Sequence, residues 1–136
     1  MPPSPEIPLA ATVGFDHLYG LEILEAHEGT VRGTVTVRDE LKQPAGLVHG
    51  GVYASIAESL ATTGTAFAVH EQGKTAAAMS TQMSFLRPIT QGRMDAVARA
   101  RHRGRTTWVW EVEIADEAGR LCVLIRATVS VGEPSG

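Results

Sequence analysis

Hydrophobic and polar residues alternate with two different periods along this chain. Between residues 31 and 37, valine and glycine alternate with arginine and threonine, which is typical of a strand with one face in water. Between Val52 and about Val69 the sequence is instead rich in alanine and in other apolar residues at helical spacing, which predicts a helix. After Gly73 the period of two returns. The pattern therefore predicts strands on both sides of one long helix.

The strands follow one another closely. We expect them at 21–26, 31–37, 76–86, 93–103, 107–115 and 121–131, with turns at 27–30, 88–92, 104 and 116–119. Short turns favour antiparallel neighbours, and one helix on one face of an antiparallel sheet gives an α+β layer. Trp108 and Trp110 alternate on one face of their strand, so we expect them in the core or in an interface.

The predicted helix contains a single carboxylate, Glu58. Apolar residues occupy most of the circumference of this helix, which indicates that the helix is mostly buried. A glutamate inside such a stretch is costly unless it is paired or used. We therefore expect Glu58 to be buried and functional.

A glycine-rich turn, His49-Gly50-Gly51, stands directly before the helix. Backbone N–H groups at a helix start have no intrahelical partner and can bind a negative charge. Together with Glu58, the turn predicts an oxyanion site and a carboxylate catalyst. A polar seam of four residues continues along one helix face at three- and four-residue spacing, and it lines an interface cleft or is a hydrogen-bonded strip without a catalytic role: Ser55, Glu58, Ser59 and Thr62.

Composition narrows the class of protein. The chain has 136 residues and a net charge of −3, which fits one domain with no overall attraction to nucleic acid or to an anionic membrane. We expect an arm and lead-in segment at 1–20 and a single domain at 21–136. The lone Cys122, the scattered histidines and the polar character of the helix favour a cytoplasmic protein without a disulfide, metal site or membrane span.

The element order and the spacing of Gln43, the His-Gly-Gly turn, Glu58 and Thr62 resemble the hotdog-fold acyl-CoA thioesterases. The likeness covers roughly residues 21–131 and includes the segments 84–88, 106–108 and 116–122. It is closest to the 4-hydroxybenzoyl-CoA thioesterase branch with a helix glutamate, and to the phenylacetate-pathway thioesterases. The resemblance implies a curved antiparallel sheet wrapped around one long central helix.

The resemblance also implies a role for each matching residue. The N–H of Gly50 would donate to the thioester oxygen, and Gln43 would help to bind or polarise that carbonyl. Glu58 would act as the nucleophile or the general base, Thr62 would position it or a water, and His49 would shape the turn. Coenzyme A enters only as part of the substrate, so no separate cofactor is implied.

The CoA nucleotide is expected to lie against basic residues. The resemblance assigns this contact to Arg87, Thr106 and their basic neighbours, which include Arg103 and Arg105. The segment 101–105 is a dense basic turn, and it is either a solvated hairpin tip or a phosphate contact. Arg105 departs from the likeness, since the relatives have a small hydroxyl residue there. Nucleic-acid binding is disfavoured because aromatic residues are few and are not interleaved with the basic ones.

The spacing along the helix has a further consequence. Gly50 and Glu58 are eight positions apart, which corresponds to roughly 12 Å along one helix. One thioester cannot touch both within a single chain, so we expect a two-fold homodimer with shared active sites. The resemblance extends this expectation to a tetramer built as a dimer of dimers. Two other functions stay open: a hotdog hydratase or dehydratase acting on hydroxyacyl thioesters, and a non-catalytic acyl-CoA-binding domain.

Overall fold

The computed structural model describes residues 13–133, so the proline-rich start of the expected arm lies outside the described residues. Two short 3₁₀ helices, η1 (Asp39–Leu41) and η2 (His70–Gln72), flank the long helix. The remaining elements follow the predicted order: α1 (Phe15–Leu18), β1 (Glu22–His27), β2 (Thr30–Thr36), α2 (Gly50–Val69), β3 (Thr75–Phe85), β4 (Arg93–Arg103), β5 (Thr107–Ala115) and β6 (Leu121–Gly132).

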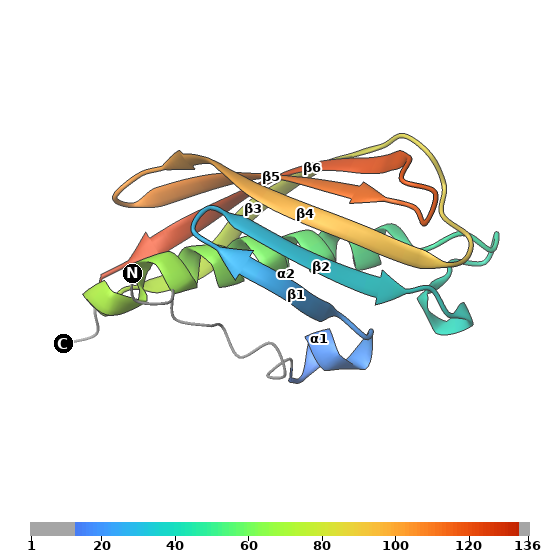
Figure 1. The fold of residues 1–136 in the computed structure, drawn as a ribbon, viewed down its shortest axis with the longest axis horizontal. Helices are drawn as coiled ribbons and strands as arrows, with labels where there is room; N and C mark the ends of the chain where they lie inside the picture. Colours follow the sequence, from blue (N-terminus) through green and yellow to red (C-terminus); the bar gives the residue numbers. More distant parts are fainter. Residues whose placement is uncertain (1–12, 134–136) are drawn as a thin grey trace.

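The strands form one curved antiparallel sheet, and α2 lies along one of its faces (Figure 1). The order across the six-stranded sheet is β1-β2-β4-β5-β6-β3, and every neighbouring pair is antiparallel. This arrangement confirms the predicted α+β class with one central helix. None of the described helices is both long enough and apolar enough to cross a membrane.

The position of β3 differs from the expectation that strands joined by short turns are neighbours. β3 pairs with β6 at the edge of the sheet, whereas β4 lies between β2 and β5. The connection 86–92 is longer than a usual hairpin loop of two to five residues, so it can pass across the ends of the intervening strands. The N–H groups of Leu86 and Arg87 both donate to the Cys122 carbonyl, at 2.8 and 3.1 Å, and tie this crossing to β6.

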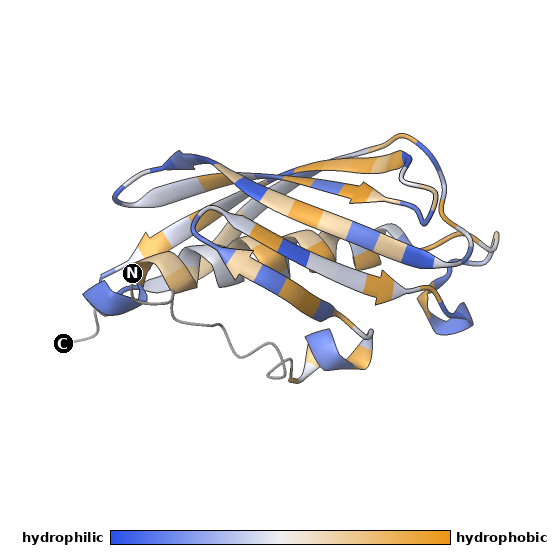
Figure 2. Cartoon of the chain, in the orientation of Figure 1, coloured by the Kyte–Doolittle hydropathy of each residue, from blue (hydrophilic) through white to orange (hydrophobic). Residues whose placement is uncertain are grey.

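The hydrophobic core lies between the sheet and α2. Both predicted core tryptophans, Trp108 and Trp110, are buried on the helix-facing side of β5. Alternation of apolar and polar residues is visible along β4 in Figure 2. The Trp110 indole N–H donates to the Thr65 hydroxyl at 2.8 Å, and its ring packs against Gly64. A close approach of this kind requires glycine, because a side chain at that position would enter the ring.

The prediction that α2 is buried around most of its circumference is wrong for the single chain. Its buried residues lie on one side of the helix, whereas Gly51 and Glu58 are exposed and Ala54 and Ala66 are half-buried. Ala54 and Ala66 extend the apolar pattern onto the open side, which otherwise carries the polar seam that includes Glu58. Because the sheet covers the opposite side of the helix, Glu58 lies outside the core.

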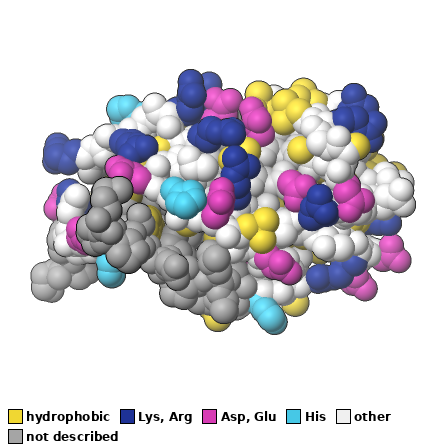
Figure 3. Space-filling view, viewed as in Figure 1, with side chains coloured by type: hydrophobic (Ala, Val, Ile, Leu, Met, Phe, Trp, Pro, Cys, Tyr) yellow, Lys and Arg dark blue, Asp and Glu magenta, His cyan; other side chains and the backbone are white. Residues whose placement is uncertain are grey.

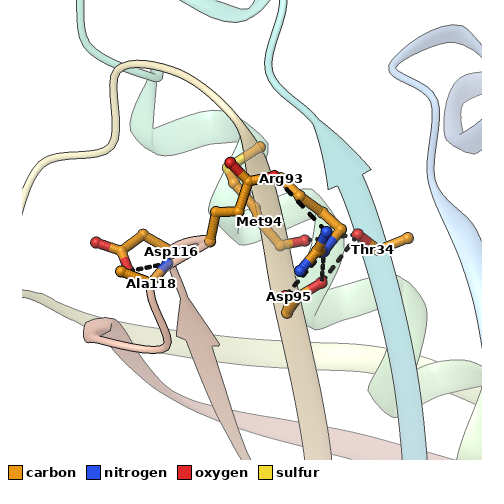
Figure 4. A network of polar contacts seen from close by, with 7 residues as sticks. Thr34, Arg93, Met94, Asp95, Asp116 and Ala118 are labelled. Carbon is orange, nitrogen blue, oxygen red and sulfur yellow. Dashed lines mark hydrogen bonds and ion pairs between the residues drawn. The ribbon is translucent and has the colours of Figure 1, made fainter.

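Polar contacts stabilise the end of the sheet that contains the β5–β6 turn (Figure 4). The Thr34 hydroxyl donates to the Met94 carbonyl and to Asp95 Oδ1, both at 3.1 Å, and Arg93 Nε donates to the same carboxylate. Asp116 closes the neighbouring turn by accepting from the backbone N–H groups of Ala118 and Arg120, both at 3.0 Å. On the face shown in Figure 3, acidic and basic side chains are intermixed.

The Gly64→Ala substitution tests the packing that fixes α2. Alanine ordinarily stabilises a helix by about 1 kcal/mol relative to glycine. Here its Cβ would lie 2.7 Å from Trp110 Cζ2 and 2.9 Å from Val31 Cγ2. We expect the overpacking to dominate and to lower the free energy of unfolding by about 1–2 kcal/mol, measured by urea denaturation at fixed protein concentration. A gain in stability would contradict this packing.

Candidate active site

The start of α2 is capped by the side chain of His49. This residue has extended backbone angles (φ −65°, ψ 137°), and its Nδ1 accepts a hydrogen bond from the Gly51 N–H at 2.8 Å. One of the free donors of the helix start is thereby satisfied. Within residues 13–133, no acceptor is found for the N–H of Gly50. The turn thus leaves that donor available to a ligand.

A hollow of about 340 Å³ opens beside this donor, and we call it the Gly50 hollow. The Phe85 ring lies over Gly50, so that a Cβ at position 50 would be 3.1 Å from Phe85 Cζ. Tyr53 and Phe85 have ring centroids 6.0 Å apart. The lining is mostly apolar, with one amide and one guanidinium: Gln43, Leu47, Val48, Gly50, Tyr53, Phe85, Leu86, Arg87 and Pro88.

Two polar side chains in the Gly50 hollow have groups free to donate hydrogen bonds. Gln43 Oε1 accepts from the Ala45 N–H within its own turn, which leaves the side-chain NH₂ as a donor. The buried Tyr53 hydroxyl donates to no acceptor within the described residues. Burial is the main cause that raises the pKa of Tyr53, so the hydroxyl keeps its proton at neutral pH. The Gln43 amide is therefore available as a donor to an oxygen atom of a ligand, whereas the Tyr53 hydroxyl is buried below the surface of the hollow.

Glu58 opens into a different hollow of about 280 Å³, which we call the Glu58 hollow. It lies between α1 and the outer side of α2, and its lining residues are Val13, Phe15, Asp16, Ser55, Glu58 and Ser59. Ser55 Oγ donates to the Gly51 carbonyl at 2.7 Å, and Ser59 Oγ donates to Asp16 Oδ1 at 2.6 Å. One turn beyond Glu58, the Thr62 hydroxyl is buried without a partner within the described residues.

The structure therefore brings together only some of the predicted site residues. Gln43, Gly50 and Arg87 share one hollow, which His49 adjoins as the helix cap. Glu58 and Thr62 lie further along α2 on its outer side. The β4–β5 turn, with Arg105 and Thr106 exposed, is at the opposite end of the molecule from the start of α2 (Figure 1).

Arg103 has contacts within its own chain. Its Nη1 lies 2.9 Å from Glu28 Oε1, and its guanidinium lies 5.6 Å from the centroid of the Trp108 ring. By contrast, no carboxylate among the described residues pairs with Arg87 or Arg105. Those two guanidinium groups are the better candidates for binding a phosphate.

The contribution of α1 to the site is visible only in the structure. Asp16 accepts hydrogen bonds from Ser59 at 2.6 Å and from the Tyr19 hydroxyl at 3.0 Å. Burial is the main cause that raises the pKa of Tyr19. Asp16 and Ser59 are 43 positions apart, and no local pattern signals a contact over that distance. No group of three or more His, Cys, Asp or Glu within the described part of the chain is arranged to hold a metal ion.

Comparison with known proteins places this geometry in a family. The thioesterase superfamily model matches residues 45–123, which is more than half of the chain. Rv1847 of Mycobacterium tuberculosis, an esterase by name, is 37% identical over 126 residues and 89% of each chain. Its solved structure has a TM-score of 0.87 at 30% identity, covering 91% of this chain and 100% of that one.

Two further relatives have more specific names. The solved thioesterase HI1161 of Haemophilus influenzae has a TM-score of 0.85 at 30% identity, covering 91% of this chain and 86% of that one. A 1,4-dihydroxy-2-naphthoyl-CoA hydrolase of Listeria monocytogenes is 31% identical over 88% of this chain and 96% of its own. The chain therefore belongs to the thioesterase superfamily, a class of hydrolases, and its architecture is the hotdog fold.

The cap at the start of α2 gives a testable prediction. His49→Ala removes the acceptor of the Gly51 N–H and should lower the free energy of unfolding by about 1 kcal/mol. His49→Asn keeps a short side-chain acceptor at the cap position and should recover most of that loss. Urea denaturation of the three proteins measures both effects. If the asparagine variant is no more stable than the alanine variant, the ring does not act as a cap.

Proposed function

We propose that the protein is an acyl-CoA thioesterase that hydrolyses an aromatic or small acyl-CoA, such as 4-hydroxybenzoyl-CoA or phenylacetyl-CoA, to the free acid and CoA. One observation carries the proposal. Gly50, whose N–H has no acceptor among the described residues, lines an apolar hollow together with Arg87, while a carboxylate on the same helix stands exposed. The name of the Listeria relative supports an aromatic acyl-CoA as substrate.

The Gly50 end supplies the electrostatic part of the reaction. Attack on a thioester places negative charge on the carbonyl oxygen, and the N–H of Gly50 and the NH₂ of Gln43 would donate to it. A donor fixed in advance at that position is worth about 3–4 kcal/mol in the transition state. The positive end of the α2 dipole adds to this stabilisation.

Glu58 supplies the carboxylate, by one of two routes. As a nucleophile, it would attack the carbonyl carbon and expel the CoA thiolate, and water would then hydrolyse the mixed anhydride. As a general base, it would take a proton from the attacking water, and that proton would go to the departing thiolate. The unpartnered Thr62 hydroxyl, one turn further along α2, would hold Glu58 or the water.

A two-fold dimer would complete the site. Gly50 and Glu58 open into separate hollows of one chain, so the oxyanion donor of one subunit would face the carboxylate of the other. β3 is the edge strand adjoining Gly50, and it is exposed along nearly its whole length, which leaves it free to pair with a second copy. Pairing of two such dimers would give the expected tetramer.

The same two-fold symmetry would bring together basic residues that lie far apart in one chain. In a two-fold dimer with antiparallel helices, the β4–β5 turn of one subunit would approach the start of α2 in the other. Arg87 of one subunit, with Arg105 and Thr106 of the other, would then contact the CoA phosphates. Arg103, which pairs with Glu28, would contribute to this surface mainly through its charge.

Two other functions predict different behaviour. A hydratase or dehydratase relies on a catalytic histidine, yet the Nδ1 of His49 is occupied in capping α2. A non-catalytic acyl-CoA-binding domain has no need of the exposed carboxylate of Glu58. The thioesterase accounts for both features.

Release of free thiol from a panel of acyl-CoA thioesters tests the proposal. We expect turnover by the wild type and a decrease in kcat of at least about a thousandfold in Glu58→Ala, because the variant lacks the nucleophile or base. Glu71→Gln is a matched control, since Glu71 is an exposed glutamate just beyond the end of α2 and should retain wild-type activity.

Two other outcomes would reject the thioesterase, and a third would reject Glu58 as its catalytic residue. Binding of acyl-CoA without turnover, unchanged by Glu58→Ala, would indicate the binding domain. A change in the absorbance of a substrate double bond without thiol release would indicate the hydratase. Wild-type turnover in Glu58→Ala would show that another residue acts on the thioester.

Substitutions on the two edge strands of the sheet, β3 and β1, test the dimer. Met79 is 62% exposed at an irregularity in β3, and Leu24 is 52% exposed at an irregularity in β1. We expect Met79→Glu to place two like charges at the two-fold axis, to yield a monomer in sedimentation and to abolish turnover. Leu24→Glu should leave both the assembly and the activity unchanged. An active monomer would overturn the shared site.

A further inference from the structure

The short helix α1 is held firmly against α2, although it has only four residues. Asp16 on α1 accepts hydrogen bonds from Ser59 at 2.6 Å and from Tyr19 at 3.0 Å. The Leu21 N–H donates to the Asp16 carbonyl at 3.0 Å, and the Arg38 guanidinium donates to the Leu18 carbonyl. These bonds place α1 beside the residue that follows Glu58 in the chain.

Two apolar side chains line the Glu58 hollow, one from α1 and one from the residue just before its N-cap. Val13 and Phe15 are 78% and 63% exposed, and both line the hollow together with Glu58. The Phe15 ring also packs against Tyr19, with centroids 5.2 Å apart, which fixes its orientation. Exposed apolar groups next to a carboxylate are unfavourable in water unless a ligand covers them.

We propose that α1 forms an acyl-binding wall of the active site, with Phe15 as a specificity-determining residue for uncharged aromatic or aliphatic acyl groups. This inference rests on the proposed thioesterase function, since it takes Glu58 as the residue that meets the thioester carbonyl. The acyl group adjoins that carbonyl carbon directly. It therefore lies within reach of whatever lines the hollow around Glu58.

Size and chemistry both select the acyl part of the substrate as the occupant. A hollow of about 280 Å³ is smaller than the usual site for a whole cofactor, so it suits an acyl group rather than CoA. Its two apolar side chains would pack against a ring or a short alkyl chain. The CoA phosphates are excluded from it by the carboxylates of Asp16 and Glu58.

The carboxylate of Asp16 also favours uncharged acyl groups over negatively charged ones. Asp16 stands in the same hollow as Glu58, so an acyl group with its own terminal carboxylate would meet two like charges. An uncharged acyl group of the same size avoids this repulsion. The structure thus assigns discrimination against dicarboxylic acyl thioesters to Asp16, and the recognition of apolar surface to Phe15.

Substrate profiles of matched variants test the wall. The panel is acetyl-CoA, phenylacetyl-CoA and succinyl-CoA, and kcat/KM is measured for each. We expect Phe15→Ala to lower kcat/KM for phenylacetyl-CoA about tenfold or more and to change that for acetyl-CoA less than threefold. The control is Leu18→Ala, because Leu18 is 66% exposed on the same helix but does not line the hollow.

A second variant tests the charge. Asp16→Asn keeps an oxygen that can accept from Ser59 and Tyr19 but removes the negative charge. We expect kcat/KM for succinyl-CoA to rise severalfold relative to phenylacetyl-CoA. Asp16→Ala, which also loses both hydrogen bonds, should instead weaken activity on all three thioesters.

The outcomes separate this inference from the proposed function. Turnover by the wild type tests the thioesterase, whereas the ratio of variant to wild type across the panel tests the wall. Equal losses on all three substrates in Phe15→Ala, or the same profile in Leu18→Ala, would overturn the acyl wall and leave the thioesterase intact. No turnover by the wild type would reject the thioesterase, and the wall with it.

Discussion

The packing of one side of α2 against the curved sheet is the constraint on which the rest of the structure depends. Trp110 lies against the bare backbone at Gly64 and donates to Thr65, so helix and sheet meet at van der Waals contact with a buried hydrogen bond. This contact fixes the rotation of the helix about its axis. Glu58 must then face outward, and the start of α2 must open beside Phe85 at the edge of the sheet.

A rigid helix also holds its functional groups at fixed separations. The free donor at Gly50 and the carboxylate of Glu58 cannot approach one another, because about two turns of hydrogen-bonded backbone separate them. In the proposed two-fold dimer, each helix would provide the donor of one site and the carboxylate of the other. β3 is exposed along nearly its whole length at the edge of the sheet, and the proposed dimer would pair through it.

The environment of Glu58 comes from a part of the chain far from it in sequence. Phe15 and Asp16 of α1, with Val13 just before it, supply apolar surface and a second carboxylate, and Asp16 joins α1 to α2 through Ser59. Substitutions in α1 can therefore alter the hollow without disturbing the packing of α2 on the sheet. In the proposed site, the contact with the acyl group and the contact with the carbonyl would thus vary independently.

The sequence by itself determined the α+β class and the element order, and it placed the start of α2 to within two residues, because periodicity and glycine turns are local properties of the chain. It also singled out Gln43, Gly50 and Arg87, which the fold brings into one hollow. Only the tertiary structure decided that β3 pairs with β6 and that Glu58 lies outside the core. It alone showed that Asp16 meets Ser59. These features depend on contacts between distant segments, which leave no local pattern in the sequence.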